Sequence, residues 1–134
     1  MKKIYYKSEV ISMVVDLNKA DDGLSFFSND EEFIQVGSWN YKKGTNLPLH
    51  YHNKFDRTSS RTSECVYVIK GKVECKLFSE EGEFIDEIIL EPGQLIIQLS
   101  QAHEYEIIED AVVLEVKNGP YFGPEKDRTR IEKK

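Results

Sequence analysis

The chain has 134 residues, of which 40% are apolar, 11% aromatic and 31% charged. This composition indicates one globular domain with a hydrophobic core and excludes a disordered chain, which would contain fewer aromatic and β-branched residues. Lys and Arg number 18 against 24 Asp and Glu, a formal net charge of −6, which argues against unspecific binding of nucleic acid.

The N-terminal segment, residues 3–15, is apolar enough to form a strand. It does not resemble a secretory signal, because Lys7, Glu9 and Asp16 interrupt any apolar stretch. No apolar run is long enough to span a bilayer, and two cysteines, Cys65 and Cys75, do not form a disulfide framework. We therefore expect a cytoplasmic protein with reduced thiols and no membrane partner.

Residues 16–32 are polar and predict a loop with one helical turn, after which the pattern is almost entirely that of strands. The short runs rich in Val, Ile, Tyr and Phe are 33–41, 65–69, 73–78, 84–90, 94–99, 104–108 and 111–116. Turn residues separate them, including Lys70-Gly71 and Glu109-Asp110. A hairpin at Lys70-Gly71 would place Cys65 opposite a residue near Lys76, with Cys75 on the other face.

Strands that recur every eight to twelve residues favour an antiparallel sandwich or barrel over an alternating βαβ sheet. No helix long enough to cover a sheet is predicted. The sequence therefore predicts an all-β fold in one domain, residues 1–134, with a core over 33–118 and a charged C-terminal tail over 123–134.

All three histidines of the chain lie near the ends of predicted strands. His50 and His52 stand two residues apart, so on a strand they project from one face and are able to bind the same metal ion. Glu64 begins the run 64–69, and His103 follows the run 94–99 after a short turn. Imidazole and carboxylate ligands together suit Fe, Mn, Ni, Co or Zn, and the sequence does not distinguish among these divalent metals.

These residues resemble the two motifs of the cupin family. The sequence resembles the first motif, G-x5-H-x-H-x3–4-E-x6-G, at Gly44, His50, His52, Glu64 and Gly71. The second motif, G-x5-P-x-G-x2-H-x3-N, is similar to Pro92-Gly93 and His103, with Leu99, Gln101 and Ile107 at positions where Pro, Gly and Asn are usual.

The resemblance implies a jelly-roll β-barrel, an antiparallel double-stranded β-helix, with one divalent metal bound by His50, His52, Glu64 and His103. It also implies a homodimer, often formed by exchange of N-terminal strands. Eleven residues, 53–63, separate His52 from Glu64 where the motif has three or four. Asp56 is therefore an alternative carboxylate ligand, although the spacing of Glu64 to Gly71 favours Glu64 and a loop insertion leaves strand register intact.

Three further residues are candidates for binding or catalysis. If His103 faces inward, Tyr105 shares its face as a candidate catalytic proton donor, and the alternative is a core tyrosine with its hydroxyl at the rim. Arg57 and Arg61 in the 53–63 insertion are candidates to bind a carboxylate or phosphate, or to form part of a lid. The alternative for both is a solvated polar loop.

Three functions are consistent with such a site. The first is an isomerase or epimerase that acts on a small oxygen-rich metabolite, such as a sugar or sugar nucleotide, with the metal polarising a carbonyl. The second is an Fe(II)-dependent dioxygenase. The third is a cupin that binds a metabolite without catalysis. The expected partner in each case is a small molecule.

Overall fold

The computed structural model describes all residues 1–134, and it is mostly antiparallel β-sheet with almost no helix, which confirms the all-β prediction. In chain order the elements are β1 Lys2–Tyr6, β2 Glu9–Asp16, the 3-10 helix η1 Leu17–Lys19, β3 Gly23–Phe26, β4 Gly37–Asn40, β5 Glu64–Phe78, β6 Phe84–Leu90, β7 Gln94–Gln98, β8 Ala102–Lys117 and α1 Pro124–Asp127. Neither helix is long and apolar enough to cross a membrane.

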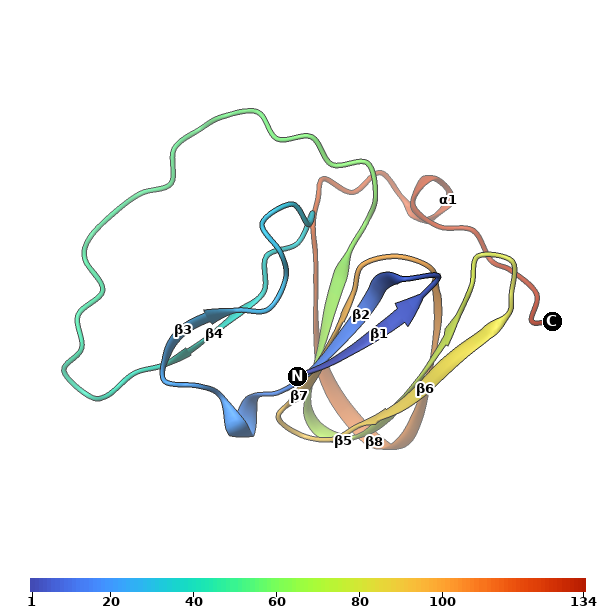
Figure 1. The fold of residues 1–134 in the computed structure, drawn as a ribbon, viewed down its shortest axis with the longest axis horizontal. Helices are drawn as coiled ribbons and strands as arrows, with labels where there is room; N and C mark the ends of the chain where they lie inside the picture. The colour runs from blue at the N-terminus through green and yellow to red at the C-terminus, as the bar shows by residue number, and fades with distance from the viewer.

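The main sheet has the strand order β1-β2-β7-β5-β6, with β8 paired to β5 (Figure 1). One edge of β5 pairs with β8 along almost its whole length, and its other edge pairs first with β7 and then with β6. Since β8 pairs with no strand other than β5, its outer edge is free. The sheet curls but no closed barrel is found, and β3 and β4 form a separate hairpin.

The predicted hairpin turn at Lys70-Gly71 is wrong, because β5 runs continuously through these residues. Gly71 has φ +86°, and the register with β8 shifts between Val68 and Val73, so this is a bulge at which both strands bend together. Glu109-Asp110, the other predicted turn, lies at the same bend inside β8. Because the chain bends here instead of turning back, the predicted strands 65–69 and 73–78 form the single strand β5. In the same way, 104–108 and 111–116 form the single strand β8.

The bulge also changes which residues of β5 face the core. Before it, Val66 and Val68 enter the same buried cluster as Val73 and Cys75 after it, although the alternation of a regular strand would separate them. Cys65 belongs to the second buried cluster on the opposite face. The two cysteines are therefore both free and on opposite faces, as the sequence predicted, although they lie on one strand rather than on two.

The strand boundaries predicted near the N-terminus also differ from those in the structure. Residues 3–15 form the hairpin β1–β2, with its turn at Lys7-Ser8, rather than one strand. Both of its strands pair within the chain, since β2 also pairs with β7. Of the run 33–41, only Gly37–Asn40 is a strand, and η1 is the helical turn expected within 16–32.

Two hydrophobic clusters lie on the two faces of the sheet around β7. One face buries side chains such as Ile11, Leu77 and Ile96, and the other buries Met13 and Ile97 beneath the chain around residues 27–36. A strand that is covered on both faces needs apolar side chains at successive positions. This explains the continuous apolar sequence in β7.

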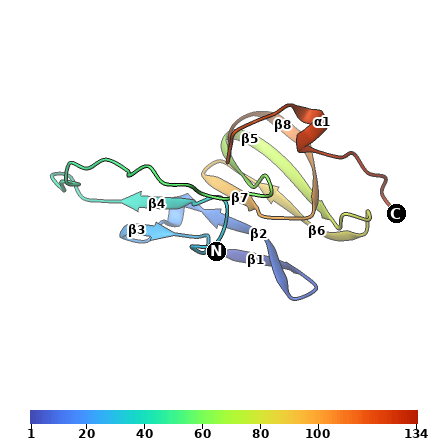
Figure 2. The same ribbon diagram turned by 90° about the horizontal axis from the view of Figure 1, so that it is seen from above.

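Residues 41–62 belong to neither of the two hydrophobic clusters. Every one of them is exposed, and in both views they form an arc that extends away from the sheet beyond β3 and β4 (Figures 1 and 2). No residue from 46 to 58 forms a hydrogen bond or ion pair with the rest of the chain. We name residues 41–62 the arm.

The bend in β5 and β8 predicts a specific sensitivity at Gly71. A Cβ atom there would lie 2.2 Å from the Asp110 carbonyl oxygen, in addition to the strain of the positive φ. We expect Gly71→Ala to lower the free energy of unfolding by about 2–4 kcal/mol in urea titrations. Gly44→Ala is the matched control, because Gly44 has φ +91° with nothing within 4 Å, and a loss of about 1 kcal/mol is expected. Equal losses would contradict the close approach at the bend.

Candidate functional site

Glu64 and His103 meet on the inner side of the curled sheet. Glu64 Oε1 lies 2.9 Å from His103 Nε2. His103 pairs with Leu77, thirteen residues after Glu64 along β5, a separation of about 40 Å in a straight strand. The contact therefore exists because β5 and β8 bend at Gly71, and because Glu64 pairs with Gln98, from which a tight turn leads to His103.

The Glu64 carboxyl is buried yet ionised. Burial alone would raise its pKa, but hydrogen bonds with His103 and Glu115 and the nearby Lys117 ammonium lower it to about 2. The Glu115 carboxyl carries the opposite shift: its hydrogen bond with Glu64 raises its pKa, and burial adds to this. Glu64 is thus a negative charge on the inner face of the sheet, stabilised by donors and cations around it.

A chain of buried and partly buried polar side chains lies beside this pair. The Ser12 hydroxyl donates to Gln98 Oε1, and Gln98 Nε2 lies 3.2 Å from both Tyr105 Oη and Cys75 Sγ. The rings of Tyr105 and His103 are 5.3 Å apart. Burial raises the pKa of the Tyr105 hydroxyl above its ordinary value, so this group stays protonated and able to donate a hydrogen bond.

Strand alternation places the inner side chains of β8 as the sequence predicted. His103, Tyr105 and Ile107 pair with Leu77, Cys75 and Val73, which are buried in the core. Antiparallel partners point to the same side of a sheet, so all three β8 residues face inward, while Glu104 and Glu106 face outward.

His50 and His52 lie far from this inner face, on the arm. Their ring centroids are 5.2 Å apart, and His50 Nδ1 lies 2.8 Å from the Pro48 carbonyl oxygen. A backbone bond at Nδ1 orients the ring and leaves Nε2 for a ligand. Both side chains are exposed and neither contacts Glu64 or His103.

The structure therefore brings together two of the four predicted metal ligands and leaves the other two as a separate pair. No group of three or more His, Cys, Asp and Glu side chains within the chain is arranged to hold a metal ion. Of the two candidate carboxylates, Glu64 contacts a histidine and Asp56 is exposed on the arm.

Arg57 and Arg61 also lie on the arm. The Arg57 guanidinium stacks on the Phe55 ring, 3.9 Å from its centroid, and Arg61 is 3.7 Å from a carboxylate oxygen of Glu80. Arg61 also lines a cavity of about 530 Å³ together with residues at the start of β2 and around Ser100. Within the single chain, neither arginine joins the Glu64–His103 pair.

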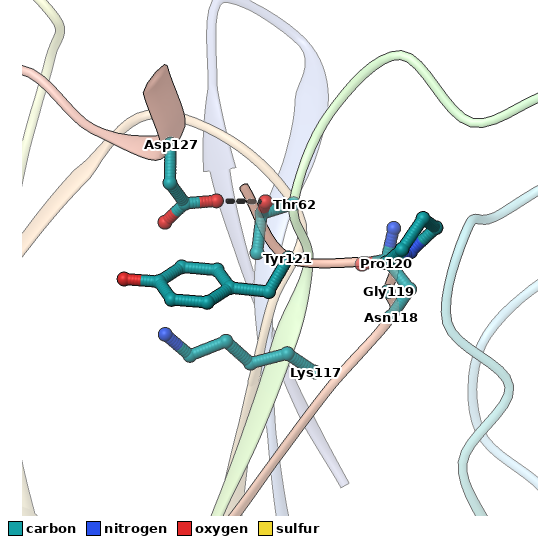
Figure 3. Close-up of a pocket in the computed structure, with 7 residues that line it drawn as sticks. All are labelled: Thr62, Lys117, Asn118, Gly119, Pro120, Tyr121 and Asp127. Atoms are coloured by element: carbon teal, nitrogen blue, oxygen red, sulfur yellow. Dashed lines mark hydrogen bonds between the residues drawn. The ribbon is translucent and has the colours of Figure 1, made fainter. Parts of the chain in front are cut away.

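A second cavity, of about 290 Å³, opens where β8 ends (Figure 3). Its lining residues are Thr62, Lys117, Asn118, Gly119, Pro120, Tyr121 and Asp127. Figure 3 shows the Tyr121 ring between the Lys117 side chain and the hydrogen-bonded pair of Thr62 and Asp127. Lys117 is the register partner of Glu64, so this cavity adjoins the Glu64 end of the inner face.

Sequence reasoning missed the side chains that support Glu64. Glu115 and Lys117 continue the odd-numbered inner positions of Tyr105 and Ile107 along β8, so alternation was the signal that identifies them. Gln98 gave no such signal, because a glutamine within an apolar strand has no distinctive motif and its three partners come from three other strands.

No protein-family model matches this chain, and neither a curated protein nor a solved structure matches it.

The buried network around Gln98 leads to a prediction for stability. Gln98→Leu removes the acceptor for Ser12 and the donor to Tyr105, so it leaves a buried serine hydroxyl without its partner. We expect a loss of about 1–3 kcal/mol in the free energy of unfolding, measured by urea titration. Adding Ser12→Ala removes the orphaned hydroxyl and should recover part of the loss. Strictly additive losses would contradict the coupling.

Proposed function

We propose that this chain is a small cupin-type protein that binds one divalent transition metal through Glu64, His103, His50 and His52 and acts there on an oxygen-rich anionic metabolite. The observation that carries the proposal is the 2.9 Å contact between Glu64 and His103. These residues are 39 positions apart, and the motif resemblance in the amino-acid sequence independently selects both of them.

The donor atoms of this pair suit a metal. An ionised carboxylate and an imidazole nitrogen are ligands for Fe, Mn, Ni, Co and Zn. Two ligand atoms that are each about 2.1 Å from a metal and at a right angle to each other lie about 3 Å apart. The separation between Glu64 Oε1 and His103 Nε2 therefore fits neighbouring ligands as well as a direct hydrogen bond.

The surrounding residues favour an oxygen-rich anionic ligand. When bound, the metal supplies a Lewis acid for a carbonyl or hydroxyl oxygen. Tyr105, protonated and hydrogen-bonded to Gln98, would donate a hydrogen bond to a substrate oxygen beside His103. The Lys117 ammonium, in the cavity that adjoins Glu64, offers a charge to a carboxylate or phosphate. An isomerase- or epimerase-type reaction on a sugar or sugar nucleotide uses these groups most directly.

Metal binding is tested by elemental analysis of the purified protein and by calorimetric titration of the metal-stripped protein with Zn²⁺, Mn²⁺ and Ni²⁺. We expect one ion per chain for the wild type. His103→Ala and Glu64→Gln should each weaken affinity at least about tenfold, because each removes a proposed ligand or its charge.

Glu109→Gln is the matched control for loss of a carboxylate, since Glu109 is exposed on the same strand as His103 and away from Glu64. It should leave affinity unchanged. A wild type that neither contains nor takes up any of these metals would sink the proposal.

Anion binding by the arm is a separate prediction. If Arg57 and Arg61 hold the anionic part of the ligand, the double variant Arg57→Ala/Arg61→Ala should weaken binding of uridine diphosphate glucose about tenfold or more, as measured by calorimetry. Lys54→Ala, which removes one charge from the same arm, is the control. Equal affinities for the double variant and the wild type would show that the arginines belong to a solvated loop.

A further inference from the structure

The free edge of β8 and the inner face beside it lack a cover. Ile107 faces the same side as the buried Val73, yet it is 57% exposed. Val113 faces the same side as the buried Val68 and is also exposed. Side chains that point toward a core but remain in water indicate that a strand or layer is missing from this part of the sheet.

The arm has the properties of such a strand. Along residues 47–52, Leu47, Leu49 and Tyr51 alternate with Pro48, His50 and His52, which is the alternation of a strand with two different faces. Leu49 is fully exposed, and no residue from 46 to 58 bonds to the rest of the chain. A segment this apolar in water is expected to be buried elsewhere.

The arm is anchored at both ends in a way that directs it away from its own β8. At one end, β4 pairs with β3, and the Asn40 side chain donates to the Ala20 carbonyl. At the other end, the Asn118 side chain donates to Ser59 Oγ and to the Arg61 carbonyl. Between these anchors the chain leads outward in both views (Figures 1 and 2).

The charges of the two surfaces are complementary. The arm carries five basic residues, Lys42, Lys43, Lys54, Arg57 and Arg61, against one acidic residue, Asp56. Strand β8 carries five acidic residues, Glu104, Glu106, Glu109, Asp110 and Glu115, against one basic residue, Lys117. A basic strand beside an acidic edge is favoured, whereas two copies of either surface would repel each other.

We propose that two copies of this chain exchange arms, so that residues 47–52 of one copy pair with the free edge of β8 in the other. With His50 and His52 turned to the inner face, beside His103 and Glu64 of the second copy, alternation turns Leu49 and Tyr51 to the outer face. There they lie on the side of β8 that carries the exposed Leu114 and Val116. Each proposed metal site is thereby assembled from two chains, which accounts for the two separate ligand pairs within one chain. The inference rests on the proposed metal site for its ligand set, but the exchange itself is testable without metal.

A disulfide between two proposed ligand positions tests the exchange directly. In the double variant His50→Cys/His103→Cys, mild oxidation should link the two positions across the copies, because ligands of one metal lie within reach of each other. Non-reducing electrophoresis is then expected to give a dimer-sized band. The native thiols of Cys65 and Cys75 are buried, and each single variant controls for random coupling of an exposed cysteine.

A monomer-sized product linked within one chain would overturn the exchange, and so would the absence of any link. Light scattering gives a second measure: the wild type should have the mass of a dimer. Leu49→Asp should raise the dissociation constant of the dimer at least about tenfold, because only in the exchanged arrangement does this side chain lie on the same face as the apolar side chains Leu114 and Val116 of β8. Ser8→Asp adds the same charge in the β1–β2 turn and should have no effect.

These measurements separate the two proposals. A copy lacking His50 and His52, refolded together with a copy lacking His103, should recover one intact site per mixed dimer if sites are shared, and none if each site lies within one chain. Metal binding by the wild type without this recovery would overturn the exchange and leave the proposed function standing. A cross-linked dimer that binds no metal would support the exchange and remove the proposed function.

Discussion

The bend at Gly71 is the constraint on which the rest of the structure depends. Only a residue without a Cβ atom fits against the Asp110 carbonyl at this point, and the bulge allows β5 and β8 to turn together without losing their pairing. The bulge also moves Val73 and Cys75 onto the same face as Val66 and Val68, which produces one continuous inner core. Without the bend, Glu64 and His103 would lie far apart on a flat sheet.

The inner face that this bend creates combines a charge with a buried polar network. Hydrogen bonds with His103 and Glu115 and the nearby Lys117 hold the pKa of the Glu64 carboxyl low, and burial of its hydroxyl raises the pKa of Tyr105 further above neutrality. The face therefore carries an ionised carboxylate, which can accept hydrogen bonds, beside a neutral hydroxyl, which can donate one. Gln98 donates to that hydroxyl and accepts from Ser12, so side chains of neighbouring strands orient the tyrosine.

Whereas the polar groups of the inner face have partners within the chain, residues 46–58 of the arm bond to no other part of it and the outer edge of β8 pairs with no strand. The arm and strand β8 both expose apolar side chains, and the charges of the two segments have opposite sign. In a monomer such an edge would be open to unspecific strand pairing, and charged residues alone reduce this tendency without removing it. The proposed pairing of each arm with the β8 edge of a second copy would cover both surfaces and would make the metal site depend on the dimer.

The sequence by itself determined the all-β class and most strand positions, because alternation is a local pattern. It also named Glu64 and His103, which the structure brings into contact. It misjudged Lys70-Gly71 and Glu109-Asp110, since a glycine with positive φ serves equally in a turn and in a bulge, and only the pairing of β5 with β8 distinguishes them. Gln98 became recognisable only in the folded chain, because its partners come from three other strands. Alternation placed Glu115 and Lys117 on the inner face, but only the pairing of β8 with β5 showed that they lie beside Glu64. The tertiary structure also decided that His50 and His52 lie on an arm away from Glu64, a separation that depends on contacts distant in sequence rather than on residue spacing.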